Sequence, residues 1–170
     1  PDKFVRRVCK SDFGVELPPA GQYSVGNIFL PKNVVEREYC KKALNRLIAA
    51  EGQTLIVWRD VPQATDFANI GPSARLAEPK IEQVFIAAAE GLDTLAFERK
   101  LYLIRKQASH LLRTDKSLKQ ATLFYICSLS TRTLIYKGML TPAQVVPYYL
   151  DLSDPDFETH LAMVPSRFLT

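Results

Sequence analysis

Residues 93–112 are the longest stretch of the sequence with a regular helical pattern. Phe97, Leu101 and Ile104 recur at three- and four-residue spacing, and charged residues occupy many of the positions between them. This spacing predicts a helix that buries one apolar stripe, with Asp93 as its N-terminal cap. Such a helix packs its stripe on another layer of the fold, so the rest of the chain has to supply an apolar surface.

Three stretches are predicted to be strands because they are short, apolar and bounded by turn residues: Tyr23–Leu30, Thr54–Trp58 and Ile81–Ala88. A second helix is predicted to begin after Asn33, which is a suitable cap, and to end near Ala50. Helices and strands alternate without a regular strand–helix–strand repeat. This order favours the α+β class, with helices packed on mostly antiparallel sheet.

The segment FYICSLSTRTLIYKGMLTPAQ, residues 124–144, is predicted to be a hairpin followed by a helix. Its first strand is expected to turn at Ser130–Thr131, and its second strand to end at Lys137–Gly138. Thr141 precedes a proline and is expected to cap a short helix. A final strand is expected at His160–Phe168.

Composition limits the class of protein. The chain has 170 residues, 47% of them apolar, so it is long enough for one domain with a real core, and residues 1–170 are expected to form a single domain. A net charge of +4 is too low to predict a nucleic-acid partner. No apolar run approaches the roughly 18 residues that a membrane span needs, so no membrane partner is expected.

Cysteine and histidine patterns give no metal site. Cys9, Cys40 and Cys127 form no C-x-x-C pair, and an odd number of cysteines favours a reducing compartment. His110 and His160 stand far apart, with no cysteine or acidic cluster at ligand spacing. Neither a metal nor another cofactor is therefore expected in this stretch of chain.

Three candidates for chemistry have simpler structural explanations. Cys9 could be a nucleophile, but no base is near it in sequence, and a structural thiol is the favoured interpretation. Arg59–Asp60 could be a site pair, although an ion pair at a strand end is favoured. Arg167, on the predicted last strand, could bind a carboxylate through two parallel hydrogen bonds, with a surface salt bridge as the alternative.

Six segments follow one another along nearly the whole chain. They are ELPPAGQYSVGNIFLP (16–31), WRDVP (58–62), GPSARLAEPKIEQVFI (71–86), FERKLYLIRK (97–106), FYICSLSTRTLIYKGML (124–140) and YYLDLSDPDFETHLAMVPSRFLT (148–170). In this order they closely resemble the class II glutamine amidotransferase domain of the glutamate synthase large subunit. The resemblance implies that the segment 124–140 is a hairpin of the amidotransferase sheet and part of the scaffold.

The resemblance also implies a fold and a reaction. The fold is a four-layer αββα arrangement of the N-terminal-nucleophile type, with two stacked antiparallel sheets between helices. The nucleophile is a cysteine at the mature N-terminus, expected upstream of Pro1, and its α-amine is the base. Attack on the glutamine side-chain amide gives a thioester and ammonia, with an oxyanion hole that stabilises the intermediate. The complete parent enzyme is expected to carry FMN and an iron–sulfur cluster outside this stretch.

The same resemblance assigns the substrate-binding residues. SRFLT resembles the family's substrate-binding strand, so Arg167 is expected to bind the α-carboxylate of glutamine, next to Phe168 and Thr170. Two residues depart from the family pattern: Pro165 stands where a histidine is usual, and Leu169 where a serine is usual. Both changes adjoin Arg167, and proline cannot donate to a sheet ladder.

The function expected from these features is that of an inactive piece of a glutaminase domain. Glutamine and the remaining domains of the large subunit are the expected partners, and a missing terminal strand would leave a sheet edge open to self-association. The expected location is the cytoplasm, or a plastid in a photosynthetic eukaryote. Two alternatives stay open: a catalytically dead structural or interaction module derived from that domain, and an independent hydrolase that uses Cys9.

Overall fold

The computed structural model describes residues 1–164, and these divide into two compact units. The sheet unit consists of Leu17–Asp60 and Ala77–Tyr136. The terminal unit consists of Pro1–Glu16, Val61–Leu76 and the chain from Lys137 onward. Each unit has contacts of its own, and they are described separately below.

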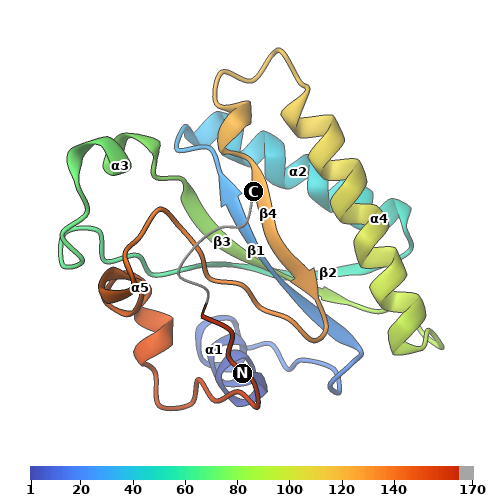
Figure 1. The fold of residues 1–170 in the computed structure, drawn as a ribbon. Helices are drawn as coiled ribbons and strands as arrows, with labels where there is room; N and C mark the ends of the chain where they lie inside the picture. The colour runs from blue at the N-terminus through green and yellow to red at the C-terminus, as the bar shows by residue number, and fades with distance from the viewer. Residues whose placement is uncertain (165–170) are drawn as a thin grey trace. The chain divides into compact units, whose positions relative to one another are not determined.

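The sheet unit contains one antiparallel sheet of four strands in the order β2-β3-β1-β4 (Figure 1). The strands are β1 (Tyr23–Leu30), β2 (Thr54–Asp60), β3 (Lys80–Ala87) and β4 (Tyr125–Ser130). Three of them match the predicted strands closely, and β4 matches the first strand of the predicted hairpin. The α+β class is therefore confirmed.

Two long helices pack on one face of this sheet. They are α2 (Val34–Ala50) and α4 (Thr94–Arg113), and a short 3-10 helix, η1 (Ala121–Leu123), leads into β4. Both predicted caps are confirmed, since Asn33 Oδ1 accepts from the backbone N–H of Glu36 and Asp93 Oδ1 accepts from that of Ala96. These caps satisfy backbone groups that have no partner inside the helix.

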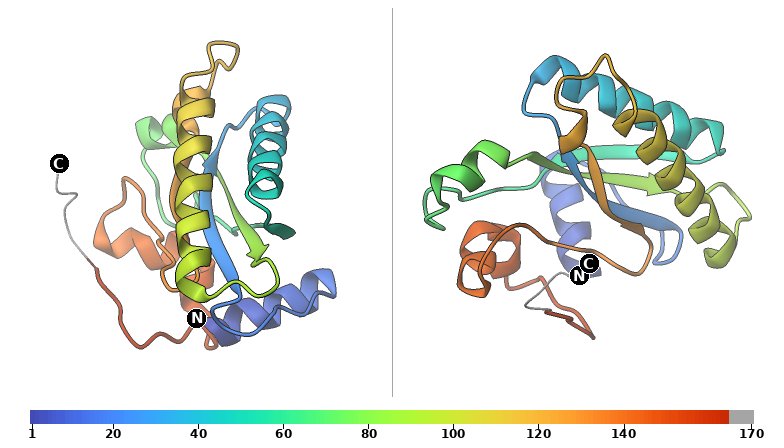
Figure 2. Two further views of the ribbon diagram at one scale, coloured as in Figure 1. Left: turned by 90° about the vertical axis from the view of Figure 1, so that its right-hand side faces the viewer. Right: turned by 45° about the horizontal axis from the view of Figure 1, so that its top comes forward.

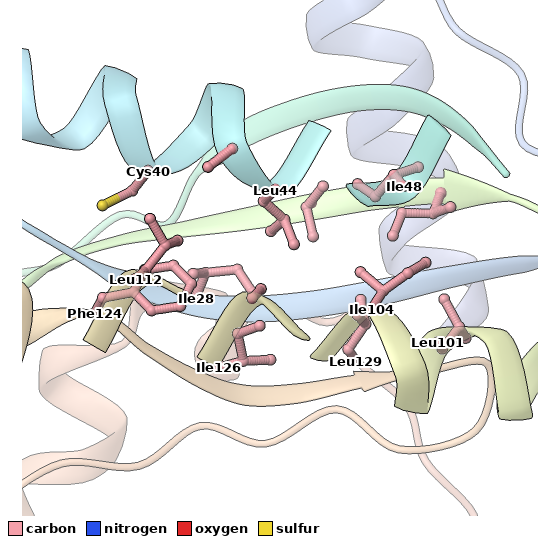
Figure 3. Packing of buried hydrophobic residues seen from close by; sticks show 14 of the residues in the cluster. Ile28, Cys40, Leu44, Ile48, Leu101, Ile104, Leu112, Phe124, Ile126 and Leu129 are labelled. Carbon is pink, nitrogen blue, oxygen red and sulfur yellow. The ribbon is translucent and has the colours of Figure 1, made fainter. Parts of the chain in front are cut away.

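The core of the sheet unit lies between these helices and the sheet. The buried cluster in Figure 3 includes Leu44 and Ile48 of α2, Leu101 and Ile104 of α4 and Ile28 of β1, and all five side chains are fully buried. The rest of the buried cluster comes from the same elements and from β3 and β4. It comprises Leu30, Cys40, Ala43, Val84, Ile86, Phe97, Ala108, Leu112, Phe124, Ile126 and Leu129.

One glycine marks where the core is tightest. A Cβ atom on Gly26, at the centre of β1, would lie 2.7 Å from Leu129 Cδ1 and 3.0 Å from Val84 Cγ1. A side chain at this position would force the Leu129 side chain to shift and would crowd Val84, which favours glycine here.

The terminal unit contains α1 (Asp2–Phe13), α5 (Pro142–Tyr148) and the 3-10 helix η2 (Leu150–Ser153). The predicted helix after Thr141 is confirmed, and Gln144 Oε1 accepts from the backbone N–H of Thr141 in a capping arrangement. The segment from Val61 to Leu76 is joined to this region by the backbone hydrogen bond from Ala64 to Tyr148. The end of this segment lies in the short helix α3 (Pro72–Ala77), which the sequence did not predict.

Two predicted strands are wrong over the residues that the structure describes. Residues 131–140 contain no strand, so the hairpin after β4 does not return into the sheet. Residues 160–164 also contain no strand, and the rest of the predicted strand His160–Phe168 lies outside the described residues. Figure 2 shows from two further directions that the chain beyond β4 is drawn as a coil and not as a strand. Within residues 1–164, no helix is long and apolar enough to cross a membrane.

Candidate functional site

The predicted substrate-binding residues Arg167, Phe168 and Thr170 lie outside the described residues, and so do Pro165 and Leu169. Their roles stay predictions. The structure does describe the chain that leads to them, through η2 and the turn that follows it. This turn, residues 154–157, is called the acidic turn below because it contains Asp154 and Asp156.

Hydrogen bonds within the acidic turn fix its shape. The backbone N–H of Asp156 donates to Asp154 Oδ1 at 2.9 Å, and the N–H of Phe157 donates to the Asp154 carbonyl at 3.0 Å. Aspartate commonly stabilises a turn in this way, by accepting from the backbone two residues further on. Both carboxylates keep an oxygen for a cation.

Helix α1 supplies the cations. Arg7 donates through Nε to Asp156 Oδ2 at 2.6 Å and through Nη2 to Asp154 Oδ2 at 2.5 Å. Lys3 Nζ lies 2.6 Å from the other oxygen of Asp156. Hydrogen bonds from Arg7 and from its own turn hold the pKa of Asp154 below the ordinary value, and hydrogen bonds from Lys3 and Arg7 do the same for Asp156.

An aromatic pair reinforces the contact between α1 and the acidic turn. The rings of Phe4 and Phe157 are tilted, with centroids 5.2 Å apart, and Phe4 is almost fully buried. The Arg7 guanidinium carbon lies 5.8 Å from the centroid of the Phe4 ring. The acidic turn is thus held on α1 by both charge and apolar contact.

None of the three cysteines forms a disulfide, and all three are buried. Cys9 lies on the inward side of α1 and is fully buried, which fits the structural interpretation and leaves no path for a substrate to reach its sulfur. Burial raises the pKa of Cys40 to about 12, helped by the charges of Glu36 and Asp115. Cys127 is buried in β4.

The remaining candidates do not assemble into a centre. His110 and His160 are both exposed, and the described residues hold no group of three metal-ligating side chains. Arg59 and Asp60 have different partners on β3: Arg59 donates to Gln83 at 2.9 Å, and Asp60 lies 3.1 Å from Lys80. These contacts anchor the end of β2, and the ion pair favoured for Arg59–Asp60 stays a prediction.

A row of polar side chains that the sequence did not predict crosses the sheet on the face opposite α2 and α4. The strand register places Arg59 opposite Gln83, Gln83 opposite Asn27, and Asn27 opposite Ser128. All four side chains are buried, which is costly for polar groups unless they find partners. The available signal was the presence of Asn27 and Gln83 inside otherwise apolar strands.

This row holds the chain that leaves β4. Asn27 Nδ2 donates to the Ile135 carbonyl at 2.8 Å, and Ser128 Oγ accepts from the Ile135 N–H at 3.1 Å. Gln83 Nε2 donates to the Tyr136 hydroxyl at 2.8 Å. Side chains therefore take the place of a neighbouring strand, which explains why the predicted return strand is absent.

Glu98 of α4 fixes the point where the chain turns away. Its Oε1 accepts from the Ser130 hydroxyl at 2.9 Å and from both the backbone N–H and the hydroxyl of Thr131 at 2.6 Å. Hydrogen bonds to a carboxylate are stronger than neutral ones. The turn predicted at Ser130–Thr131 is confirmed, and Glu98 sets its position.

An antiparallel sheet covered on one face by two helices is compatible with the α+β fold of N-terminal-nucleophile hydrolases. The whole chain, residues 1–170, matches the family described as "Glutamine amidotransferases class-II". The chain belongs to this family. The fold class and the family predicted from the sequence are both confirmed.

Curated relatives carry glutamate synthase names. The chain is 43% identical over its full length to "Glutamate synthase [NADPH] large chain" of Bacillus subtilis and spans 11% of that protein. It is 42% identical over 92% of its length to "Glutamate synthase [NADH]" of Schizosaccharomyces pombe, of which it spans 7%. It is 34% identical over 86% of its length to "Ferredoxin-dependent glutamate synthase 1, chloroplastic/mitochondrial" of Arabidopsis thaliana, of which it spans 9%. The chain therefore covers about a tenth of the length of these relatives.

Proposed function

We propose that this chain is part of the glutaminase domain of a glutamate synthase. In this role the parent protein hydrolyses glutamine to glutamate and ammonia, and the ammonia is then added to 2-oxoglutarate. The observation that carries the proposal is the family match over residues 1–170 together with 43% identity to a glutamate synthase large chain. The reaction consumes one water and breaks the carbon–nitrogen bond of the side-chain amide.

The proposed roles follow the family. Arg167 binds the α-carboxylate of glutamine through its planar guanidinium, with Phe168 and Thr170 beside it. The thiolate of a cysteine attacks the amide carbon, ammonia leaves, and water cleaves the thioester. We assign this nucleophile to a cysteine outside residues 1–170, because Cys9, Cys40 and Cys127 are all buried.

The proposal predicts that residues 1–170 alone release no ammonia from glutamine. The test is an ammonia assay on the folded chain, with Cys9→Ala alongside and circular dichroism to confirm folding. A folded chain without activity, in both forms, agrees with the proposal. Activity that disappears in Cys9→Ala would assign the nucleophile to Cys9 and overturn it.

The remaining parts of the reaction belong to the rest of the parent protein. We propose that FMN and an iron–sulfur cluster bind there, as the similarity to glutamate synthases implies. The electron donor is left open because the relatives' names specify NADPH, NADH or ferredoxin. The proposed compartment is the cytoplasm, or a plastid in a photosynthetic eukaryote.

A catalytically dead module is the second candidate function, and Pro165 and Leu169 favour it because both adjoin Arg167. The complete protein distinguishes the two candidates. Glutaminase activity that falls sharply in Arg167→Met supports the enzyme. A complete, folded protein without activity, in which Pro165→His and Leu169→Ser restore turnover, supports the dead module.

A further inference from the structure

We propose that the outer face of α4 is a docking surface for an acidic, partly apolar segment from another region of the parent polypeptide. This surface is called the α4 outer face below, and it consists of Leu95, Arg99, Tyr102, Leu103, Lys106 and Arg113, all of them exposed. The inference rests on the proposed function at one point, namely that the chain is part of a longer protein. It goes beyond that function by naming a surface and the chemistry of its partner.

Helix α4 has two sets of apolar side chains, and only one set is covered. The stripe that begins at Phe97 is fully buried in the core of the sheet unit. By contrast, Leu95, Tyr102 and Leu103 are 60%, 59% and 42% exposed. Residues seven and eight positions apart lie on the same side of a helix, so these three form one group. A group of bulky apolar side chains in contact with water is typical of an interaction surface, whereas a single one is ordinary.

The α4 outer face also carries positive charge that no neighbour neutralises. Arg99 and Lys106 lie three residues before and four residues after Tyr102, so both flank its ring. In the part of the chain that the structure describes, Arg99, Lys106 and Arg113 have no carboxylate partner. The one acidic residue of α4, Glu98, is occupied by Ser130 and Thr131.

A neighbouring cation shows the contrast. Lys100, also on α4, lies 3.0 Å from a carboxylate oxygen of Glu51, which follows α2 within the sheet unit. Lys100 is therefore already used in holding the sheet unit together. The cations of the α4 outer face remain available for a partner.

These features define the chemistry of the partner. Apolar side chains placed over Tyr102 and the two leucines would remove them from water, which is favourable. Carboxylates at the edge of the same contact would meet Arg99 and Lys106, and such charge complementarity selects the partner and its orientation. Tyrosine and arginine are also enriched in protein interfaces.

The size of the face favours a partner in the same polypeptide. Separate proteins that associate stably use roughly 20–30 residues on each side, far more than the α4 outer face offers. Segments of one polypeptide need less contact, because their covalent connection keeps them at high effective concentration. The chain spans 11% of the Bacillus subtilis large chain, so most of a parent of that size lies outside residues 1–170.

Two other occupants fit the α4 outer face less well. A second copy of this face, related by two-fold symmetry, would bring like charges together, which is unfavourable. A helix on an anionic membrane buries its main apolar face in the lipid. The main apolar stripe of α4 is already buried in the protein core.

The test uses the complete protein and a carbodiimide, which joins a lysine amine directly to a carboxylate in contact with it. Lys106 is expected to form an amide cross-link with an aspartate or glutamate of the same polypeptide outside residues 1–170, located by mass spectrometry. The exposed Lys42 of α2 is the internal control, with a yield of such cross-links about tenfold lower. A mixture of isotope-labelled and unlabelled protein distinguishes cross-links within one polypeptide from those between copies.

Charge reversal tests the electrostatic part. Arg99→Glu/Arg113→Glu keeps Lys106 for labelling and should lower its cross-link yield about tenfold, because like charges then face each other. Lys42→Glu/Lys116→Glu makes the same change of charge at other exposed positions of the sheet unit and should leave the yield unchanged. Circular dichroism confirms that each variant is folded.

A second pair of variants tests the apolar part. Tyr102→Ser removes the exposed ring and should lower the Lys106 cross-link yield several-fold, because aromatic side chains often dominate an interface. Tyr102→Phe keeps the ring and should change the yield less than about twofold.

The outcomes separate this inference from the proposed function. A cross-link from Lys106 to an acidic segment of the same polypeptide, weakened in Arg99→Glu/Arg113→Glu and in Tyr102→Ser, supports the inference. The inference is overturned if Lys106 forms no such cross-link or joins a second copy or another protein. Binding to vesicles of phosphatidylcholine and phosphatidylserine that Tyr102→Ser abolishes would assign the face to a membrane and also overturn it. Glutaminase activity is measured on the same preparation, and its absence overturns the proposed function while the cross-link still decides the inference.

Discussion

The side-chain amide of Asn27, in the middle of β1, donates a 2.8 Å hydrogen bond to the backbone carbonyl of Ile135. Asn27 is 1% exposed, whereas Ile135 lies at the surface, so the bond is partly buried. Its other amide atom, Oδ1, has no partner among the described residues. Asn27 therefore holds the chain after β4 and carries the cost of one unsatisfied acceptor.

Asn27 is expected to matter through its donor. Asn27→Ala removes the bond and leaves the Ile135 carbonyl without this donor, which should lower the free energy of unfolding by about 1 kcal/mol. Urea unfolding measures the loss, with the exposed Lys42→Ala as a control that should change stability by less than about 0.5 kcal/mol. An Asn27→Ala protein as stable as the wild type would show that this bond does not hold the segment.

Glu98 is expected to matter through its charge. Glu98→Gln keeps an acceptor oxygen but loses the charge that strengthens three hydrogen bonds to Ser130 and Thr131, so it should cost about 1 kcal/mol of unfolding free energy. Glu98→Ala should cost more, because it leaves the Thr131 N–H without its acceptor. The exposed Glu90→Gln is the matched control in the same urea experiment. Equal stability of Glu98→Gln and Glu98→Ala would contradict the role of the acceptor.

The contact between α1 and the acidic turn is expected to weaken in acid. The folded-state pKa values of Asp154 and Asp156 are lowered by Arg7 and Lys3. Their stabilising effect is therefore fully present above the ordinary aspartate pKa of about 3.9, and it is lost as the pH falls through the lowered values. Hydrogen exchange of residues 150–164 between pH 6 and about pH 2.5, corrected for the intrinsic rate, measures the loss.

The double variant Asp154→Asn/Asp156→Asn provides the control for this pH dependence. It has no carboxylates to protonate in the acidic turn, so its corrected exchange should be fast at every pH and show no acid transition. An identical transition in the variant and the wild type would assign the pH effect to other groups. Because the side chains are exposed, raising the salt concentration should also weaken the wild-type contact.

Local signals in the sequence predicted most of the sheet unit. Asn33 and Asp93 have capping side chains, and the strand Tyr23–Leu30 is bounded by turn residues, so each element could be recognised within a few residues. The return strand after Ser130 could not be predicted correctly, because its absence depends on Asn27 and Ser128. Asn27 is 108 positions from Ile135 in the sequence, and Ser128 is in the preceding strand. No local pattern encodes these contacts.

The contacts at the candidate site also could not be predicted from local sequence patterns. The contacts of Arg7 with Asp154 and Asp156 join opposite ends of the sequence, and an arginine on an exposed helix face gives no sign of such a partner. The family itself could be predicted, because six segments in order carry far more information than any one residue pattern. The substrate-binding roles of Arg167, Phe168 and Thr170 rest on that resemblance.

The thiols provide the last prediction. Cys9, Cys40 and Cys127 are all buried, and burial raises the pKa of Cys40 to about 12, so almost none of it is thiolate near neutral pH. A chromogenic disulfide reagent should therefore label none of them rapidly in the folded chain of residues 1–170, and all three after unfolding in urea. Cys9→Ala should leave the labelling of the folded chain unchanged. Rapid labelling that is lost in Cys9→Ala would mean that Cys9 is open to reagents in solution, and it would revive the possibility that this thiol is a nucleophile.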